Sequence, residues 1–400
     1  MRPTGRLHIG HYFGALQNWV RLQNDPEYDC FYFIADWHAL TSDYADTSQI
    51  AQNTIEIVTD YLAAGLDPKK SVIFQQSLIP EHAELHLLLS MVTPLSWLER
   101  VPTYKEAFEN VKDKDLHTYG FLGYPCLQTA DIVIYSKIGT PLFVPVGEDQ
   151  VSHVELSREI VRRFVVFYGK EDWAKAEKGA ARSIIASLKG RLPAATPGDS
   201  AEKTAEYLLR LVPYDERQSL LANNKVPLVE VLTEPGVMLT KTPRVPGLDG
   251  RKMSKSYANA ITLSESDDDI RKKTKVMVTD PARKRRTDPG NPDICPVYDW
   301  HKLFSPKETL EWAAHGCRTA GIGCIECKSK MADHLIQWIA PVRERRLKYE
   351  TPAGQREVLE IIDAGSKTAR AEAKTTMSRV REAVFGWDKK RNEIASADSQ

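Results

Sequence analysis

The feature that most constrains the fold is a set of short strand-like runs that are apolar along their whole length. They lie at residues 30–35, 71–76 and 140–146, and a helical pattern follows each of them. Strands that are buried on both faces are typical of parallel sheets whose connections are helices. The pattern therefore predicts an α/β fold with a Rossmann-type doubly wound parallel sheet.

The pattern of apolar and polar residues changes twice after these strands. Residues 169–230 contain helical stretches interrupted by a segment rich in proline and glycine, which predicts a helical insertion. From residue 261 onward the apolar spacing is helical throughout. We therefore expect a Rossmann-type domain over residues 1–260 that carries the insertion, and an all-helical second domain over residues 261–400.

Composition restricts the possible partners and the compartment. The chain has 54 basic and 54 acidic residues, so an RNA partner would have to be held by a local basic patch. We expect a cytoplasmic protein, because there is no signal-peptide pattern and no apolar run of about 18 residues. The basic clusters are candidates for RNA contact or, alternatively, solvated faces: Arg271, Lys272, Lys273, Lys275, Arg283, Lys284, Arg285, Arg286, Arg343, Arg345 and Arg346.

The first motif that carries chemistry is "TGRLHIGH", which places His8 and His11 around Gly10 at the start of an amphipathic helix. Backbone N–H groups at a helix start attract phosphate, and a glycine lets a nucleotide approach the backbone. Two histidines there could donate hydrogen bonds to developing negative charge. The alternative is a pair of surface histidines at a helix start.

The second motif is "PGLDGRKMSKS", a loop in which Lys252 and Lys255 flank Met253 and Ser254. A flexible loop with two ammonium groups and two hydroxyls can close over a triphosphate and stabilise the charge of the transition state. The alternative for such a lysine pair is a solvated basic loop.

Together, "HIGH" at residues 8–11 and "KMSKS" at residues 252–256 resemble the two signatures of class I aminoacyl-tRNA synthetases. Three stretches resemble the bacterial tryptophanyl enzymes of that class: "GYPCLQTADI", "VPVGEDQVSHVELSREI" and "TPRVPGLDGRKMSKS". The resemblance runs from residue 2 to about residue 385, apart from the insertion.

This resemblance implies ATP-dependent activation of tryptophan, with Mg²⁺ brought by the triphosphate, followed by transfer to tRNA(Trp) by a homodimeric enzyme. It also implies that the helical domain over residues 261–400 binds the anticodon. It implies catalytic roles for His8, His11, Lys252, Ser254 and Lys255. It assigns ATP contacts to Arg2, Pro3, Thr4, Gly10, His11, Gly147, Glu148, Asp149, Val245, Lys252, Met253, Ser254, Lys255 and Ser256. It assigns tryptophan contacts to Asp131, Tyr124, Gln150 and His38.

The residues themselves agree with two of these assignments. Asp131 follows a helical run, where a carboxylate facing a pocket would be costly without a donor, and an indole N–H is such a donor. The alternative is that Asp131 pairs with a lysine or caps a helix. "GEDQ" follows a strand end, where open α/β sheets bind ligands, although Glu148 alone also suits an ordinary helix N-terminus.

Four of the six cysteines lie within residues 295–327, spaced C-x21-C-x6-C-x2-C. Thiolates of Cys295, Cys317, Cys324 and Cys327 suit a [4Fe–4S] cluster or tetrahedral zinc. We favour the cluster, because zinc sites come more often as two short pairs and because the spacing resembles the iron–sulfur subset of the tryptophanyl enzymes. The remaining alternative is four unrelated cysteines.

Two other functions and one departure from the family pattern remain. A tyrosyl enzyme would need acceptors for a phenol, and a non-catalytic relative could bind RNA or tryptophan as a regulator.

Only seven residues precede His8, which is too few for both the family's first strand and the loop after it. We therefore expect the natural protein to begin upstream of Met1, and the alternative is that this chain has lost a core strand.

Overall fold

The computed structural model describes residues 1–102, 104–105, 115–191, 200–240, 243 and 245–397. The chain forms two compact units. The first unit comprises Met1–Leu78, Pro145–Glu148 and Leu239–Thr368, and the second comprises Ile79–Val144, Asp149–Met238 and Ala369–Gln400. In the described part of the chain, no helix is long and apolar enough to cross a membrane.

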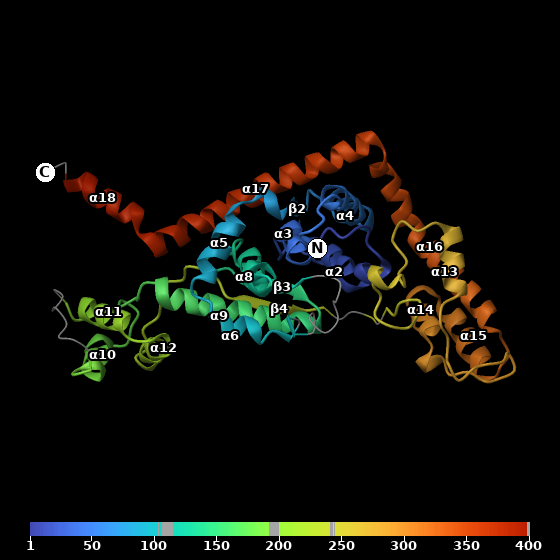
Figure 1. The fold of residues 1–400 in the computed structure, drawn as a ribbon, viewed down its shortest axis with the longest axis horizontal. Helices are drawn as coiled ribbons and strands as arrows, with labels where there is room; N and C mark the ends of the chain where they lie inside the picture. The colour runs from blue at the N-terminus through green and yellow to red at the C-terminus, as the bar shows by residue number, and fades with distance from the viewer. Residues whose placement is uncertain (103, 106–114, 192–199, 241–242, 244, 398–400) are drawn as a thin grey trace. The chain divides into compact units, whose positions relative to one another are not determined.

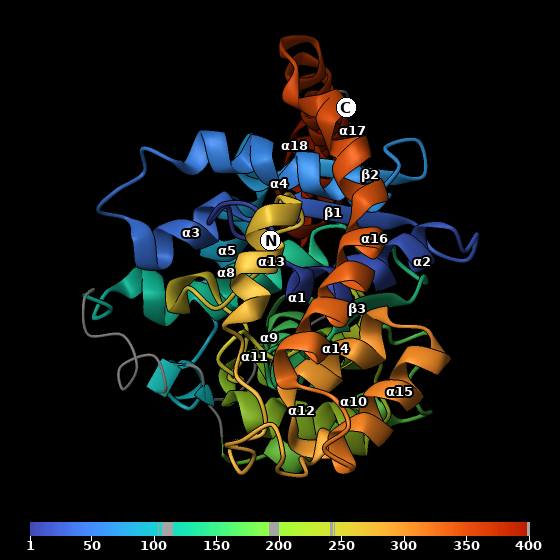
Figure 2. The ribbon, with the colours of Figure 1, turned by 90° about the vertical axis from the view of Figure 1, so that its right-hand side faces the viewer.

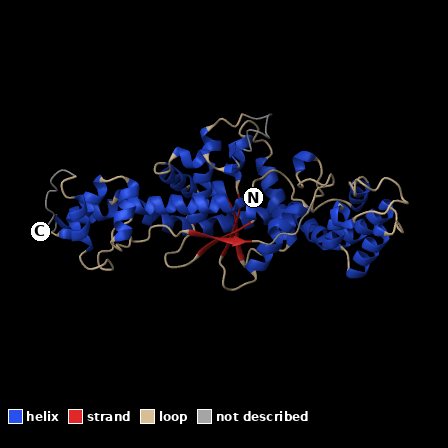
Figure 3. Cartoon of the chain, turned by 90° about the horizontal axis from the view of Figure 1, so that it is seen from below, coloured by secondary structure: helices blue, strands red, loops and turns tan. Residues whose placement is uncertain are grey.

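The first unit begins with a parallel pair of strands, drawn in red in Figure 3. Strand β1 (Cys30–Ile34) pairs with β2 (Ser71–Gln75), and Cys30 lies opposite Ser71. Helix α4 (Ile50–Ala64) lies between them in the chain and ends at Gly65, whose φ of 112° favours glycine. This strand–helix–strand unit is the parallel arrangement that the apolar strand pattern predicts.

The other elements of this half of the first unit are short. They are α1 (Ile9–His11), the π-helix η1 (Tyr12–Leu16), α2 (Gln17–Gln23), α3 (Asp36–Asp43), η2 (Gln76–Leu78) and η4 (Lys255–Tyr257). The N-terminal residues run beside β1, because the Met1 amino group donates to Phe33 O at 2.6 Å and Ala35 N–H donates to Met1 O at 2.8 Å.

The helical part of the first unit is built around α16 (Cys324–Glu350). Helices α13 (Asp267–Lys275), α14 (Pro296–Phe304) and α15 (Lys307–Arg318) gather near it, as Figure 1 shows. A short 3₁₀ turn, η5 (Pro292–Ile294), precedes α14. Trp300 is fully buried and donates to Pro246 O at 2.9 Å, so α14 is fixed to the loop that leads to the second motif.

Helix α17 (Pro352–Phe385) begins in the first unit and lies against β2. A Cβ atom on Gly365 would lie 1.9 Å from Ile73 O, so only glycine permits this close approach. Gln75 N–H donates to Ser366 Oγ at 3.3 Å, which gives a strand N–H a partner on the helix.

The second unit is mainly helical. It contains α5 (Glu81–Ser90), α6 (Leu95–Glu99), α8 (Tyr119–Val133), α9 (Val151–Tyr168) and α18 (Trp387–Ala397). It also contains most of η3 (Glu148–Gln150) and of the paired strands β3 (Leu142–Val146) and β4 (Pro235–Leu239), whose remaining residues belong to the first unit. The end of α17 is tied to α5 by Arg370, which pairs with Glu81 at 3.1 Å.

The predicted insertion contains α10 (Ala180–Leu188), α11 (Ala201–Leu211) and α12 (Tyr214–Asn223). These helices share a hydrophobic core of their own: Ala180, Ala181, Ile184, Leu188, Ala205, Leu208, Leu209, Leu221 and Val226. The insertion is therefore a small packed body, because its apolar faces are buried against each other.

Candidate functional site: a histidine turn and a lysine loop

The first motif forms a short turn in which the two histidines fix each other. His11 N–H donates to His8 Nδ1 at 3.3 Å, and His8 N–H donates to His11 Nδ1 at 3.2 Å. Since both Nδ1 atoms accept from the backbone, the ring proton of each neutral histidine lies on Nε2. The two ring centroids are 3.6 Å apart, so the two Nε2–H donors come from one small region.

Both histidines are neutral at neutral pH. Burial, and after it the charge of Lys255, lowers the pKa of His8 to about 4. Burial and the neighbouring charges lower the pKa of His11 to about 2. The turn therefore offers neutral N–H donors rather than positive charge to an anion.

Gly10 lets the two motifs meet. A Cβ atom at this position would lie 3.0 Å from ring atoms of His8 and 3.5 Å from Met253 Sδ. The backbone also joins distant segments, because Ile9 N–H donates to Ile261 O at 3.0 Å and Leu263 N–H donates to Leu7 O at 2.8 Å. The second motif thus packs beside the first within the first unit.

Lys255 is held by the backbone of the N-terminal loop. Its Nζ donates to the carbonyl oxygens of Thr4, Gly5 and Arg6 at 2.8, 2.9 and 3.1 Å. Burial lowers the pKa of Lys255, and the charge of Asp60 opposes this. An ammonium group held by neutral carbonyls can exchange them for phosphate oxygens without leaving a charge unpaired.

Asn259 organises the lysine loop and was missed by the sequence analysis. It is 2% exposed, accepts from Ser254 N–H at 2.8 Å, and donates to Asp249 Oδ1 at 2.7 Å and to Lys252 O at 3.1 Å. A Cβ atom on Gly247 would lie 2.3 Å from Asn259 Nδ2, so the glycine makes room for this amide. The only sequence signal was its place just after the second motif.

The remaining predicted nucleotide residues lie in several segments. Arg2 donates to Ser42 Oγ at 3.2 Å, and Pro3 O accepts from Asn53 at 3.0 Å. Gly147 and Glu148 belong to the first unit, and Asp149 belongs to the second. Val245 is half-buried, His38 lies on α3, and the side chain of Ser256 is outside the described part.

In the second unit, Asp131 lies on α8 with a histidine as its buried partner. His82 Nδ1 is 2.6 Å from Asp131 Oδ1, and His82 Nε2 is 2.6 Å from the hydroxyl of Tyr135. The side chains of His82 and Asp131 are 0% and 3% exposed. Asp131 thus has a buried histidine as one partner, and its expected contact with tryptophan stays a prediction.

Tyr124 lies seven positions before Asp131 on α8, which places both residues on one helix face. Its hydroxyl is 3.4 Å from His153 Nε2 on α9, and burial lowers the pKa of His153. Gln150 precedes α9 and donates to Asp149 Oδ2 at 3.3 Å. His153 lies within one of the stretches that carry the family resemblance, but the sequence analysis did not predict its contact with Tyr124.

All six cysteines are free. Among the described residues, no group of His, Cys, Asp or Glu side chains is arranged to hold a metal ion. The four predicted thiols nevertheless interact electrostatically. Burial, and after it the charges of Cys295, Cys317 and Cys324, raises the pKa of Cys327 to about 12. Their donor chemistry fits a cluster, although the described residues form no closed coordination shell.

A buried arginine lies beside these thiols. Arg283 Nη1 is 3.9 Å from Cys317 Sγ, and Arg283 Nη2 donates to Ile322 O at 2.6 Å. Its Nε has no hydrogen-bond partner among the described residues, so this cation can still bind negative charge.

Two of the basic residues suggested for RNA contact are buried instead. Arg283 is 8% exposed and Arg346 is 2% exposed, and both bind groups of the first unit. Lys284, Arg285 and Arg286 are exposed. The RNA interpretation is therefore wrong for Arg346, because a guanidinium sealed inside the protein cannot reach a phosphate.

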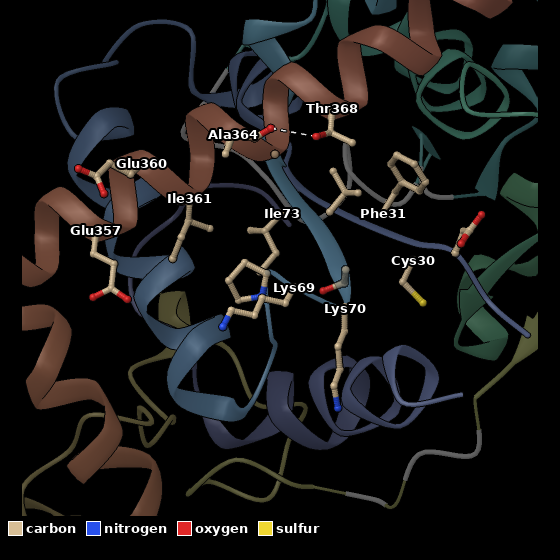
Figure 4. Close-up of a pocket in the computed structure, with 15 residues that line it drawn as sticks. Cys30, Phe31, Lys69, Lys70, Ile73, Glu357, Glu360, Ile361, Ala364 and Thr368 are labelled. Carbon is tan, nitrogen blue, oxygen red and sulfur yellow. Dashed lines mark hydrogen bonds between the residues drawn. The ribbon is translucent and has the colours of Figure 1, made fainter. Parts of the chain in front are cut away.

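A groove of about 550 Å³ lies elsewhere in the first unit, between α17 and β2. Figure 4 shows Glu357, Glu360 and Ile361 of α17 on one side and Ile73 on the strand. None of the predicted site residues lines it. The groove is separate from the histidine turn and the lysine loop, whose donor groups lie in other segments.

A sequence model described as "tRNA synthetases class I (W and Y)" matches residues 1–178 and 217–340. The chain belongs to the class I tRNA synthetases. It is 48% identical to the tryptophan–tRNA ligase of Ralstonia nicotianae over 395 residues, which are 96% of each chain. It is 44% identical to the tryptophan–tRNA ligase of Thermotoga maritima over 96% of this chain and 97% of that protein.

A solved structure supports the same family assignment. The tryptophanyl-tRNA synthetase of Campylobacter jejuni, in complex with ADP and tryptophan, is 27% identical and has a TM-score of 0.69 over 96% of this chain and 98% of that one. The predictions of the family, of the α/β fold with its helical C-terminal region, and of a tryptophan–tRNA ligase are confirmed. Residues 179–216 of the insertion lie outside the family match.

Proposed function

We propose that the chain activates L-tryptophan with ATP through its own His8 turn and Lys255 loop, and then transfers tryptophan to the 3′ end of tRNA(Trp). The observation that carries this proposal is the packing of two motifs that lie about 240 residues apart in the sequence. Their donors, two neutral imidazoles and one ammonium group, suit the oxygens of a triphosphate.

In the first step the tryptophan carboxylate attacks the α-phosphate, and pyrophosphate leaves. His8 and His11 donate from Nε2 to phosphate oxygens, and Lys255 exchanges its three carbonyl partners for the charge that develops on the leaving group. Lys252 and Ser254 lie on the same loop as Lys255 and contact ATP. Mg²⁺ arrives with ATP and neutralises part of the phosphate charge.

We assign the ATP contacts to the residues that the sequence analysis named. These are Arg2, Pro3, Thr4, Gly10, His11, Gly147, Glu148, Asp149, Val245, Lys252, Met253, Ser254, Lys255 and Ser256. Support comes from the close approach at Gly10, where a side chain would displace the ring of His8.

Tryptophan recognition is assigned to Asp131, with Tyr124, Gln150 and His38. Asp131 accepts the indole N–H, and its bond to His82 fixes the orientation of the carboxylate. A site that orients one acceptor for one N–H rejects side chains that lack this donor by roughly 10⁴-fold.

Partners and compartment are assigned on chemical grounds. The exposed Lys284, Arg285 and Arg286 provide phosphate contacts for tRNA in the helical domain over residues 261–400. We expect a homodimer, as the family resemblance implies. Six free thiols suit the reducing cytoplasm.

The exchange of pyrophosphate into ATP, measured with each of the twenty amino acids in turn, tests this function. We expect exchange with tryptophan only. Exchange with tyrosine would favour the tyrosyl alternative, and no exchange with any amino acid would favour a non-catalytic RNA-binding or tryptophan-binding regulator.

We also propose that Cys295, Cys317, Cys324 and Cys327 hold a [4Fe–4S] cluster, with zinc as the alternative. Support comes from the electrostatic interaction of the four thiols and from the nearby buried Arg283, which offsets the negative charge of thiolate ligands. The cluster would have a structural role, since it would join α14, α15 and α16.

Anaerobic purification followed by iron, sulfide and zinc analysis tests the cluster. About four irons per chain are expected, because each cysteine would ligate one iron. Stoichiometric zinc would establish the alternative. Protein that is folded and free of both metals under anaerobic conditions would refute both.

A further inference from the structure

A buried group of charges joins α4 to α16 in the first unit, where Figure 2 shows the two helices close together. Arg346 on α16 donates from Nη1 to Asp60 Oδ1 at 2.6 Å. Its Nη2 pairs with Glu56, and its Nε is 3.1 Å from Glu350 Oε1. The side chains of Arg346 and Asp60 are 2% and 0% exposed. The pair is therefore sealed from solvent.

The two oxygens of Asp60 have different partners. While Oδ1 accepts from Arg346, Oδ2 accepts from the backbone N–H of Leu7 at 2.6 Å. The carbonyl of Leu7 accepts from Leu263 N–H at 2.8 Å. The backbone of Leu7 is thus fixed on both sides, one residue before His8 and one residue after the carbonyls that hold Lys255.

Arg346 determines the charge of Asp60. Burial raises the pKa of Asp60 to about 6, and Arg346 and the Leu7 N–H oppose this rise. Without Arg346 the pKa of Asp60 would rise further, which favours the protonated carboxyl. A neutral carboxyl is a weaker acceptor than a carboxylate, so Arg346 strengthens the Leu7 bond through Asp60.

We propose that Asp60 and Arg346 are positioning residues for adenylate formation, which act by fixing Leu7 and so the histidine turn. The inference rests on the proposed roles of His8 and Lys255. It gives α16 a function in the chemical step that no sequence motif indicates. Neither residue touches substrate, so the effect is on the geometry of the turn.

The test compares Arg346→Met with Arg345→Met in tryptophan-dependent pyrophosphate exchange without tRNA. Arg345 is the matched control, because it also joins α16 to α4 but donates to Ala63 O, at 2.7 Å, rather than to Asp60. We expect Arg346→Met to lower kcat by about 10- to 100-fold with KM for tryptophan unchanged, because small misplacements of reacting groups have effects of this size. Arg345→Met should stay within about 2-fold.

Asp60→Asn gives a second, nearly isosteric variant for the case that Arg346→Met does not fold. It should also lower kcat, by about 10-fold, with KM for tryptophan unchanged, because an amide oxygen is a weaker acceptor than a carboxylate. Thermal unfolding is measured for every variant, and rates are taken well below each transition. The inference is overturned if Arg346→Met loses no more rate than Arg345→Met. It is also overturned if folded Asp60→Asn keeps a kcat within about 2-fold of wild type.

The outcomes also separate this inference from the proposed function. If the wild-type protein shows no tryptophan-dependent exchange, the proposed function fails. If the wild type is active and either Arg346→Met or folded Asp60→Asn matches the control, the function stands and the positioning role fails.

Discussion

The two units hold their candidate functional side chains in different ways. In the first unit, Lys255 is bound by three backbone carbonyls of a loop. In the second unit, Asp131 is bound by the buried side chain of His82, which in turn binds Tyr135. Carbonyl partners can be exchanged for phosphate at little cost, whereas a buried side-chain pair cannot rearrange without leaving polar groups unpaired. The surroundings of Lys255 are therefore suited to movement, and those of Asp131 to a fixed shape.

The largest effect is expected where this fixed pair is broken. Asp131→Ala should lower kcat/KM for tryptophan by at least about 100-fold, because a buried charge-assisted bond is lost and His82 loses its partner. Pyrophosphate exchange measures the effect, with thermal unfolding as the control for folding. Near-unchanged kinetics in a folded variant would remove Asp131 from the tryptophan site.

The exchangeable lysine should show a different kinetic pattern. Lys255→Ala is expected to lower kcat by about 100-fold while KM for tryptophan stays nearly unchanged, because the lysine acts on charge in the transition state. Steady-state exchange at varied tryptophan separates the two parameters. A rise in KM alone would mean that the loop only binds substrate.

A smaller effect should follow from loosening the loop rather than removing its lysine. Asn259→Ala deletes three hydrogen bonds that join Ser254, Asp249 and Lys252. We expect kcat to fall by about 10-fold, since the lysine remains but is less well positioned. Asp249→Ala removes only one of these bonds and serves as the milder control. Equal losses in both variants would contradict the central place of Asn259.

The smallest effect concerns the pH dependence of stability. The folded-state pKa of His8 is about 4, below the ordinary value of 6.5, so the unfolded chain binds its proton more readily. The stability that His8 contributes is therefore complete above pH 6.5 and is lost as pH falls toward 4. The Tm of His8→Gln should fall less than that of wild type over this window. Parallel Tm curves would show that His8 is not buried as described.

Much of the fold could be predicted, because the signals are local. The strands β1, β2 and β3 lie where apolar runs occur, and the insertion begins where the strand and helix pattern changes. The domain limits at residue 260 and the individual site residues stay predictions. The partners of Asp131 and the role of Asn259 could not be predicted, since their contacts join segments that no periodicity relates.

The sequence by itself determined the chemical groups of this protein: two histidines at a helix start, a lysine loop, a carboxylate on α8 and four close cysteines. Such groups are visible because spacing along a chain fixes which residues share a turn or a helix face. Only the tertiary structure decided that Arg346 is buried rather than bound to RNA and that Lys255 is held by the N-terminal loop. Burial and pairing depend on which distant segments meet, and a charge is sealed inside only where a counter-charge arrives from elsewhere in the chain.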